Sequence, residues 1–309
     1  MLAESIAIAL GVIGLLVLVK ATDHFMHWFS KYAREVGLNA HLIGIVLVSA
    51  MASLPEMATA VAAGAVALPE IGANILLGTN IAHLFFVMGV IAIFGHGRKV
   101  HCPVLERSKI ALFVLTFVPF LLMLDQQLSR MDGVYLIGFY ILYLGILYIK
   151  EGKLWKSKLK MKMDSVSLVH VVISGLAIVA SAYWIMKSAT FLTNPALLTL
   201  VSLTAIPLIN SFVDLLVGIQ SIVHKSKSVA VGDILGSSMS NYLLGLGVLA
   251  LIFPFGISIL ELAFVFTFSM LGMALFLFHI SEGKLDWHYG VTLLLCYVFY
   301  VIIQGVNVL

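Results

Sequence analysis

Ser53-Leu54-Pro55-Glu56 lies within a hydrophobic stretch that runs from Ala40 to Ile93. The tetrapeptide places a carboxylate and a helix-breaking proline in an otherwise apolar segment, and a second polar motif, Gly78-Thr79-Asn80-Ile81-Ala82-His83, follows it. In a lipid bilayer, a buried ionisable residue is costly and usually marks a functional site. A proline there frees backbone carbonyls, which persist only inside protein or beside a cavity. The stretch therefore predicts a polar site inside a membrane protein.

The composition is that of an integral membrane protein. Of the 309 residues, 61% are hydrophobic and 11% are charged, whereas a soluble domain has about 25% charged residues. The fold class predicted is all-α, because apolar runs of about 20 residues form transmembrane helices. Ten such runs lie at residues 4–22, 40–66, 70–94, 108–125, 133–149, 166–190, 196–223, 229–253, 257–279 and 289–307.

The lysines and arginines predict the orientation of these helices. Sixteen of the 18 lie in or beside the loops that follow the odd-numbered helices, and only Arg130 and Lys187 lie on the other side. Basic loops remain in the cytoplasm, so both termini are predicted to lie outside. The topology accounts for the net charge of +3, so nucleic-acid binding is not predicted. The basic stretch 150–162 is interpreted as an anchor beside anionic membrane lipid.

The polar motifs recur after 158 residues. With that shift Glu56 aligns with Asp214 and His83 aligns with Asn241, and the glycines at 78 and 89 align with those at 236 and 247. Both carboxylates and both downstream polar residues match in one register, which chance explains poorly. Because five helices separate the two copies, they are predicted to enter the membrane from opposite sides, as inverted five-helix repeats.

The repeat predicts three parts of the chain. Residues 1–150 form the first five-helix repeat, with site helices at 40–66 and 70–94, and residues 151–165 form a basic cytoplasmic linker. Residues 166–309 form the second, inverted repeat, with site helices at 196–223 and 229–253.

Inverted repeats place a substrate at the membrane midplane between broken helices, where alternating access can expose it to either side. They favour a transporter over a channel, which needs a continuous pore. An enzyme is not predicted, because no Ser-His or paired-Asp arrangement recurs and the acidic residues follow the repeat instead. Inorganic cations are the expected partners, and neither a cofactor nor an obligate protein partner is predicted.

The motifs resemble those of the cation/Ca²⁺ exchanger superfamily, which contains the sodium/calcium exchangers. Its repeats carry Ser/Thr-Leu-Pro-Glu and then Gly-Ser-Asn-Ile-x-Asn, which ends 27 residues after the Glu. The first copy here fits both motifs, and the second keeps the spacing of 27 residues with Ser211-Phe212-Val213-Asp214 and Gly236-Ser237-Ser238-Met239-Ser240-Asn241. The resemblance covers both copies and implies an antiporter, which we expect in a prokaryotic plasma (inner) membrane.

The resemblance also implies a ligand set for the transported cation. Glu56 and Asp214 would hold the ion, and His83 and Asn241 would complete a ring around it. Further oxygens would come from the backbone carbonyls around Ala52 and Asn210 and from the side chains of Ser53, Thr79, Ser211 and Ser237.

This set makes chemical sense apart from the family. Ca²⁺ takes six to eight oxygen ligands, and two carboxylates neutralise one divalent ion. Without that ion they repel each other until protons or monovalent ions enter, which is a physical basis for exchange. No Lys or Arg lies at membrane depth to pair with Glu56 or Asp214, which favours a functional role over a structural ion pair.

Four departures bear on the choice of ion. Val213-Asp214 replaces the second Pro-Glu, Asn241 lacks the negative charge that some members have there, and Ala52 lacks a hydroxyl. His83 stands where the family has Asn, and its structural alternative is a packed hydrogen-bonding residue. Imidazole beside carboxylates suits Mn²⁺, Fe²⁺ or Zn²⁺ better than Ca²⁺, and histidine as a residue type titrates near neutrality.

The sequence therefore predicts a secondary-active antiporter that exchanges a divalent cation, Ca²⁺ by resemblance, for Na⁺ or H⁺. The alternative is a proton-coupled transition-metal antiporter with His83 as a ligand.

Three further residues depart from the repeat. Pro207 precedes Asp214 by seven residues instead of one, so the break in that helix is expected elsewhere along it. Asp233 is expected near the cytoplasmic mouth, either attracting cations or capping a helix. Glu261 has no counterpart in the repeat, and its role stays open.

Overall fold

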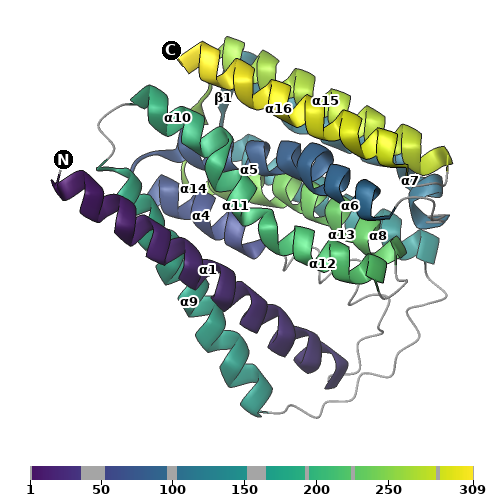
Figure 1. Cartoon of the computed structure of the whole chain (residues 1–309), viewed down its shortest axis with the longest axis horizontal. Helices are drawn as coiled ribbons and strands as arrows, with labels where there is room; N and C mark the ends of the chain where they lie inside the picture. The colour runs from purple at the N-terminus through teal and green to yellow at the C-terminus, as the bar shows by residue number, and fades with distance from the viewer. Residues whose placement is uncertain are drawn as a thin grey trace.

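The part of the chain that the structure describes is helical, as predicted, apart from one short pair of strands (Figure 1). The computed structural model describes residues 2–35, 53–95, 103–151, 165–191, 195–223, 227–282 and 286–308. Ala52 lies outside these residues. The strands β1 (Gln127–Leu128) and β2 (Phe255–Gly256) pair antiparallel and tie together two interhelical turns.

Nineteen elements follow one another along the described ranges, including the two strands. The α-helices before residue 152 are α1 (Leu2–Glu35), α4 (Leu54–Ala65), α5 (Pro69–Ile81), α6 (Met88–Phe94), α7 (Pro103–Leu122) and α8 (Arg130–Glu151). Those after it are α9 (Ser165–Ala189), α10 (Pro195–Leu203), α11 (Ala205–Asn210), α12 (Phe212–Val223), α13 (Lys227–Met239), α14 (Leu246–Ile252), α15 (Ile259–Glu282) and α16 (Trp287–Val308). Two π-helices, η2 (Ala82–Val87) and η4 (Ser240–Gly245), and one 3₁₀ helix, η3 (Met123–Asp125), complete the order.

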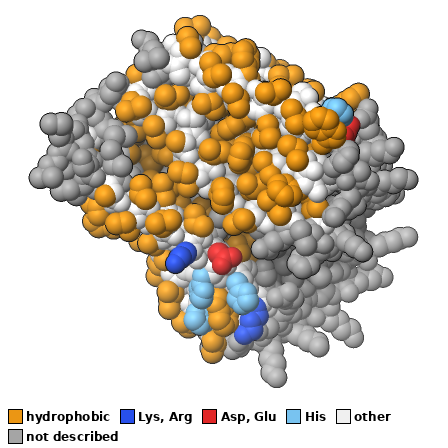
Figure 2. All heavy atoms as spheres, in the orientation of Figure 1, with side chains coloured by type: hydrophobic (Ala, Val, Ile, Leu, Met, Phe, Trp, Pro, Cys, Tyr) orange, Lys and Arg blue, Asp and Glu red, His pale blue; other side chains and the backbone are white. Residues whose placement is uncertain are grey.

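Within the described ranges, seven helical stretches are long and apolar enough to cross a membrane. They are Ala9–Phe29, Pro69–Phe94, Val166–Ala189, Ala196–Leu216, Val231–Ile252, Ile259–His279 and Trp287–Val306. Hydrophobic side chains dominate the face shown in Figure 2, as expected for a protein surrounded by lipid. Of the ten predicted spans, 108–125 and 133–149 largely coincide with α7 and α8, which are not among the seven. The part of 40–66 before Ser53 lies outside the described residues.

The helix boundaries repeat along the chain with the predicted shift. Helices α12, α13, η4 and α14 each begin and end 158 residues after α4, α5, η2 and α6, respectively. We call residues 53–94 the first copy and residues 211–252 the second copy. The match includes the two π-helices, which are rare elements, so the two copies share backbone geometry as well as sequence.

The two copies form the centre of the molecule. Most residues of Pro69–Phe94 and Val231–Ile252 are buried, whereas most of α1, α9 and α16 are exposed or only partly buried. Helices α1 and α9 lie side by side as an outer pair, and α15 and α16 run together on the opposite side of the copies (Figure 1). The polar motifs are thereby shielded by apolar helices.

Two glycines let helix α5 approach its neighbours closely. A Cβ at Gly72 would lie 2.5 Å from the backbone oxygen of Ala60 on α4, and one at Gly78 would lie 2.6 Å from that of Leu203 on α10. Any larger residue would push these backbones apart. These two glycines therefore allow α5 to pack closely against α4 of the same copy and against α10 in the second half of the chain.

In each copy a helix begins two residues before the carboxylate. Helix α4 begins at Leu54, with Pro55 in its first turn, where proline is tolerated because it lacks only an unused N–H. In the second copy a single turn residue, Ser211, separates α11 from α12. The expected break elsewhere along this helix lies at Thr204, just before the short helix that carries Pro207, and the break at Ser211 is a second one. Ser211 donates its hydroxyl to the backbone oxygen of Pro207 at 2.8 Å, a local bond that can interrupt a helix without a proline at that point.

Candidate metal centre

Three of the predicted ligands meet at one point in the centre of the molecule. The side chains of Glu56, His83 and Asp214 each offer a ligand atom, and these atoms all lie within 4.8 Å of one another. All three side chains are buried, with exposed fractions of 1%, 0% and 3%. Glu56 and His83 come from the first copy and Asp214 from the second, so the group exists only where the copies pack together.

Helix starts position both carboxylates. Glu56 is the third residue of α4, and Asp214 is the third residue of α12. The unpaired N–H groups of a first turn carry partial positive charge, which stabilises a carboxylate placed there. The two acids therefore occupy equivalent places in the two copies, each in the first turn of a helix.

A π-helix positions the histidine. His83 is the second residue of η2, and Asn241 is the second residue of η4. One turn of π-helix inserts an extra residue into an α-helix and is frequent at functional sites. The sequence analysis did not predict these π-helices. Each π-helix contains the last residue of a downstream motif, His83 or Asn241, which the family resemblance implies to line the cation site.

His83 makes the shortest contact in the group. Its Nε2 lies 2.7 Å from Oδ2 of Asp214, yet neither ring nitrogen has a partner with the directions of a hydrogen bond among the described residues. Oε2 of Glu56 likewise has no such partner. Two atoms that bind the same metal ion, each at about 2.0–2.4 Å from it, must also lie close to each other, as these two atoms do. Unpartnered ligand atoms that converge in this way fit a cation site better than a finished hydrogen-bond network.

A second contact joins the copies beside this group. Ser53 Oγ donates a hydrogen bond to the backbone oxygen of Ser237 at 3.2 Å, and the two hydroxyl oxygens are 3.0 Å apart. Asn241 donates its amide to Oδ1 of Asn80 at 3.3 Å. Asn80 was not among the predicted site residues, although it lies inside the quoted motif between Thr79 and His83.

The remaining predicted ligands are buried near helix ends. Thr79 donates its hydroxyl to the backbone oxygen of Ile75 at 2.7 Å, which leaves the lone pairs of that hydroxyl available. Asn210 closes α11, and neither atom of its buried side-chain amide has a hydrogen-bond partner among the described residues. The side chain of Asn210, rather than its backbone alone, is therefore a candidate ligand.

Asp233, which was expected near a cytoplasmic mouth, has a buried side chain. Its side chain is 4% exposed, and Oδ1 has no hydrogen-bond partner in the described parts of the chain. The sequence held one signal for this position, since Asp233 precedes the motif residue Ser237 by one helical turn.

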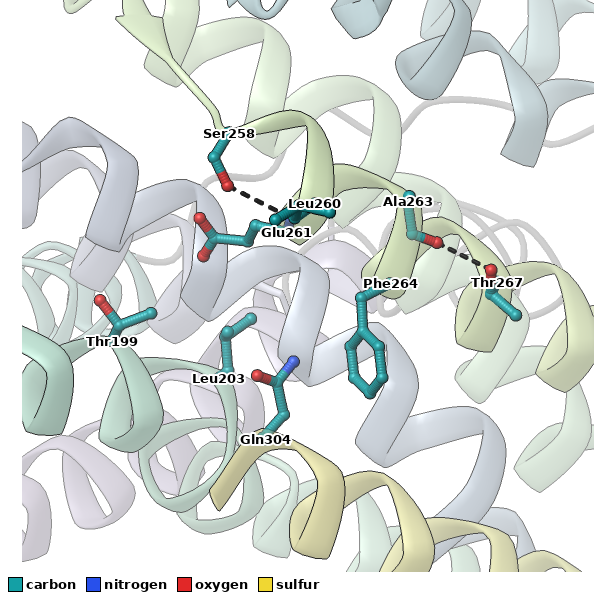
Figure 3. Close-up of a pocket in the computed structure, with 9 residues that line it drawn as sticks. All are labelled: Thr199, Leu203, Ser258, Leu260, Glu261, Ala263, Phe264, Thr267 and Gln304. Atoms are coloured by element: carbon teal, nitrogen blue, oxygen red, sulfur yellow. Dashed lines mark hydrogen bonds between the residues drawn. The ribbon is translucent and has the colours of Figure 1, made fainter. Parts of the chain in front are cut away.

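An open cavity of about 610 Å³ lies apart from this group, between α10, α15 and α16 (Figure 3). None of the predicted ligands lines it. Glu261 at its wall accepts a hydrogen bond from the side chain of Asn74 on α5 at 2.7 Å, and the N–H of Glu261 donates to Ser258 Oγ at 3.2 Å. Glu261 therefore ties α15 to α5, which is a structural role that the repeat could not reveal.

Comparison with known proteins agrees with this architecture. The family described as sodium/calcium exchanger protein matches residues 6–149 and 166–306. The inner membrane protein YrbG of Escherichia coli (strain K12) is 28% identical over 264 residues, covering 81% of each chain. The sodium/calcium exchanger MaX1 of Methanosarcina acetivorans is 23% identical and covers 94% of this chain and 96% of its own.

The fold is shared with a solved exchanger. The structure of the sodium-calcium exchanger NCX_Mj superposes with a TM-score of 0.68 at 17% identity, covering 97% of this chain and 99% of the other. Together with the family match over both halves of the sequence, these findings establish the relationship. The chain belongs to the sodium/calcium exchanger protein family.

Proposed function

We propose that this protein is a secondary-active antiporter that moves a divalent cation, Ca²⁺ in the first instance, in exchange for Na⁺ or H⁺. The convergence of Glu56, His83 and Asp214 within 4.8 Å is the observation that carries the proposal. The names of the relatives support the choice of ions, since MaX1 and NCX_Mj are described as sodium/calcium exchangers. YrbG is described as an inner membrane protein, which supports a place in a prokaryotic plasma membrane.

The charges favour a divalent ion. Glu56 and Asp214 together carry two negative charges when ionised, and among the described residues neither forms an ion pair with Lys or Arg. Burying two uncompensated carboxylates side by side is costly. One divalent ion, or two or more monovalent ions or protons, would relieve that cost. Competition between the divalent ion and the monovalent ions or protons for the same carboxylates gives exchange.

Exchange also requires that the ion reaches both sides in turn. We propose that residues 1–150 and 166–309 act as two inverted halves, joined by the linker 151–165, with both termini outside. The equal helix boundaries of the two copies support this division. Alternating access then follows from movement of helices around a fixed midplane site. The ligand set would include Asn241, Ser53, Ser211, Thr79, Ser237, Asn210 and the backbone near Ala52.

A second candidate function is proton-coupled transport of a transition metal. His83 supports it, because its ring lies among the carboxylates with no hydrogen bond on either nitrogen in the described structure. Neutral imidazole binds Mn²⁺, Fe²⁺ and Zn²⁺ well, whereas Ca²⁺ prefers oxygen ligands. In this case His83 is a direct ligand and the counter-ion is H⁺.

Uptake of ⁴⁵Ca²⁺ and ⁵⁴Mn²⁺ into proteoliposomes tests both candidates. Wild type, His83→Asn and Glu56→Gln are compared under an imposed Na⁺ gradient or an imposed H⁺ gradient. Glu70→Gln serves as the matched control, because Glu70 is exposed at the start of α5. We expect counter-ion-dependent uptake in wild type and Glu70→Gln, and its loss in Glu56→Gln.

The His83 variant separates the candidates. Ca²⁺ uptake driven by Na⁺ that survives His83→Asn assigns the protein to Na⁺/Ca²⁺ exchange. Mn²⁺ uptake driven by H⁺ that His83→Asn abolishes assigns it to metal/proton exchange. Absence of counter-ion-dependent flux with every divalent ion tested would exclude both.

A further inference from the structure

Two histidines from different helices face each other on the outer pair of helices α1 and α9. Nε2 of His24 on α1 lies 3.3 Å from Nδ1 of His170 on α9. Among the described residues, neither ring makes another hydrogen bond or an ion pair. His24 is exposed and His170 is partly buried, and Figure 2 shows histidine side chains gathered near the lower edge of the molecule. The two rings therefore form an accessible pair of nitrogens at a helix–helix contact.

Close packing of the two helices fixes this approach. A Cβ at Gly14 on α1 would lie 2.9 Å from the side chain of Ile185 on α9, and one at Gly175 on α9 would lie 3.7 Å from that of Phe25 on α1. The helices thus run antiparallel along one another, as Figure 1 shows. The last third of α1 is thereby held against the first turns of α9, and the histidines meet without a movement of the backbone.

A tryptophan holds the ring of His170. Trp28, one turn after His24 on α1, stacks on His170 with ring centroids 4.0 Å apart and planes 13° apart. The ammonium of Lys31 lies 4.6 Å from the centroid of the Trp28 ring, a cation–π contact that steadies the indole. The His24 ring meets the His170 ring at 66°, edge to face. The plane of His170 is therefore set by Trp28, while its Nδ1 stays turned toward His24.

The spacing of the two nitrogens fits a shared metal ion. Zn²⁺ binds histidine nitrogen at about 2.0–2.1 Å, and two ligands at a tetrahedral angle then lie about 3.3–3.4 Å apart. Both rings must turn a lone pair toward the ion, which needs only rotation of His24 about its soft Cβ–Cγ torsion. Imidazole suits Zn²⁺, Ni²⁺ and Cu²⁺, whereas Ca²⁺ prefers oxygen. The pair therefore has the chemistry of a transition-metal site.

We propose that His24 and His170 form a surface site for one transition-metal ion of the Zn²⁺ type, with water in the remaining positions. The site is separate from the group of Glu56, His83 and Asp214 and goes beyond the proposed function. The basic residues predict that this end of α1 faces the cytoplasm, so the metal is taken from that side. Because α9 also packs against α4, which carries Glu56, a metal that ties α1 to α9 restrains helices next to the proposed transport site.

The number of Zn²⁺ ions bound per protein tests this assignment. Binding of ⁶⁵Zn²⁺ to the purified full-length protein is measured by equilibrium dialysis in excess Ca²⁺, with His83→Asn in every protein to remove the central imidazole. His24→Gln and His170→Gln are added to this background one at a time. His27→Gln is the matched control, because His27 is exposed on α1 and its ring contacts Trp28 rather than His170.

We expect His24→Gln and His170→Gln each to bind about one Zn²⁺ fewer than the background, and His27→Gln to bind the same number. Zn²⁺ is also expected to raise the unfolding temperature of the background and of His27→Gln, but not of the other two proteins, because a ligand that binds the folded state stabilises it. If one of the two variants is not monodisperse, the other decides the result.

Three outcomes overturn the proposal. An equal number of Zn²⁺ ions in all four proteins makes the pair an interhelical hydrogen bond only. Loss of Zn²⁺ in His27→Gln as well as in the other two indicates adventitious binding to scattered surface histidines. No Zn²⁺ bound by the background removes the site. Failure of the proposed function gives a different result, the absence of counter-ion-dependent flux, which leaves the Zn²⁺ number of these proteins unchanged.

Discussion

Nε2 of His83 lies 2.7 Å from Oδ2 of Asp214, so a side chain of the first copy touches a side chain of the second at the centre of the protein. The contact puts an imidazole, rather than an amide, against a carboxylate at the meeting point of the two copies. An ion that binds between these side chains would hold the copies together, and its departure would leave one carboxylate facing another. The contact therefore makes ion binding and the packing of the two copies interdependent.

Removal of either carboxylate is expected to abolish divalent transport. In Glu56→Gln and Asp214→Asn, one of the two charges that balance the ion is lost in a buried site. An unbalanced charge there costs several kcal/mol, so we expect divalent affinity to fall by at least about 100-fold. Isothermal titration of the purified variants measures this. Wild-type affinity in either variant would contradict the ligand assignment, provided that Glu70→Gln also behaves as wild type.

Binding of a transition metal is expected to weaken as the pH falls. A histidine nitrogen binds metal only when it is unprotonated, so protons and metal compete at His83, and acid conditions favour the proton. We expect metal binding to release protons in wild type and to release fewer in His83→Asn. Proton release is followed with an indicator dye in weakly buffered solution. Equal release by the two proteins would show that His83 is not a ligand.

The hydroxyl pair that joins the copies is expected to stabilise the protein modestly. Ser53 and Ser237 interact through their side chains at 3.0 Å, and interhelical hydrogen bonds in membranes contribute about 0.6 kcal/mol on average. We expect Ser53→Ala and Ser237→Ala to be non-additive by about this amount in a double-mutant cycle. The free energy of unfolding in detergent is the measured quantity. Strict additivity would mean that the pair contributes nothing.

The bond between Asn74 and Glu261 is expected to matter for stability rather than for ion selectivity. It joins α5 to α15 at 2.7 Å, outside the group of Glu56, His83 and Asp214. A hydrogen bond to a charged group contributes about 1.5–3 kcal/mol, so Asn74→Leu is expected to lower the unfolding temperature by several degrees. The ratio of Ca²⁺ to Mn²⁺ uptake is expected to stay at its wild-type value. A changed ratio would place the pair in the ion pathway.

Several features of the protein followed from the sequence by itself. Membrane insertion, the helical fold and the 158-residue repeat depend on composition and local pattern, because lipid forces every backbone group to bond within its own helix. The pairing of Glu56 with Asp214 followed from the register of the repeat. His83 followed from the family motif, at a position where this chain carries an unusual residue.

Other features depended on packing between segments far apart in the chain. The approach of His83 to Asp214 and the bond between Asn74 and Glu261 each join residues more than 100 positions apart, which no local pattern encodes. Asp233 is the clearest case, since its neighbours in sequence fit a helix end near the membrane surface. Only the tertiary structure shows that its side chain is buried, with 4% of it exposed, because burial depends on which helices pack together and not on the residues adjacent in the chain.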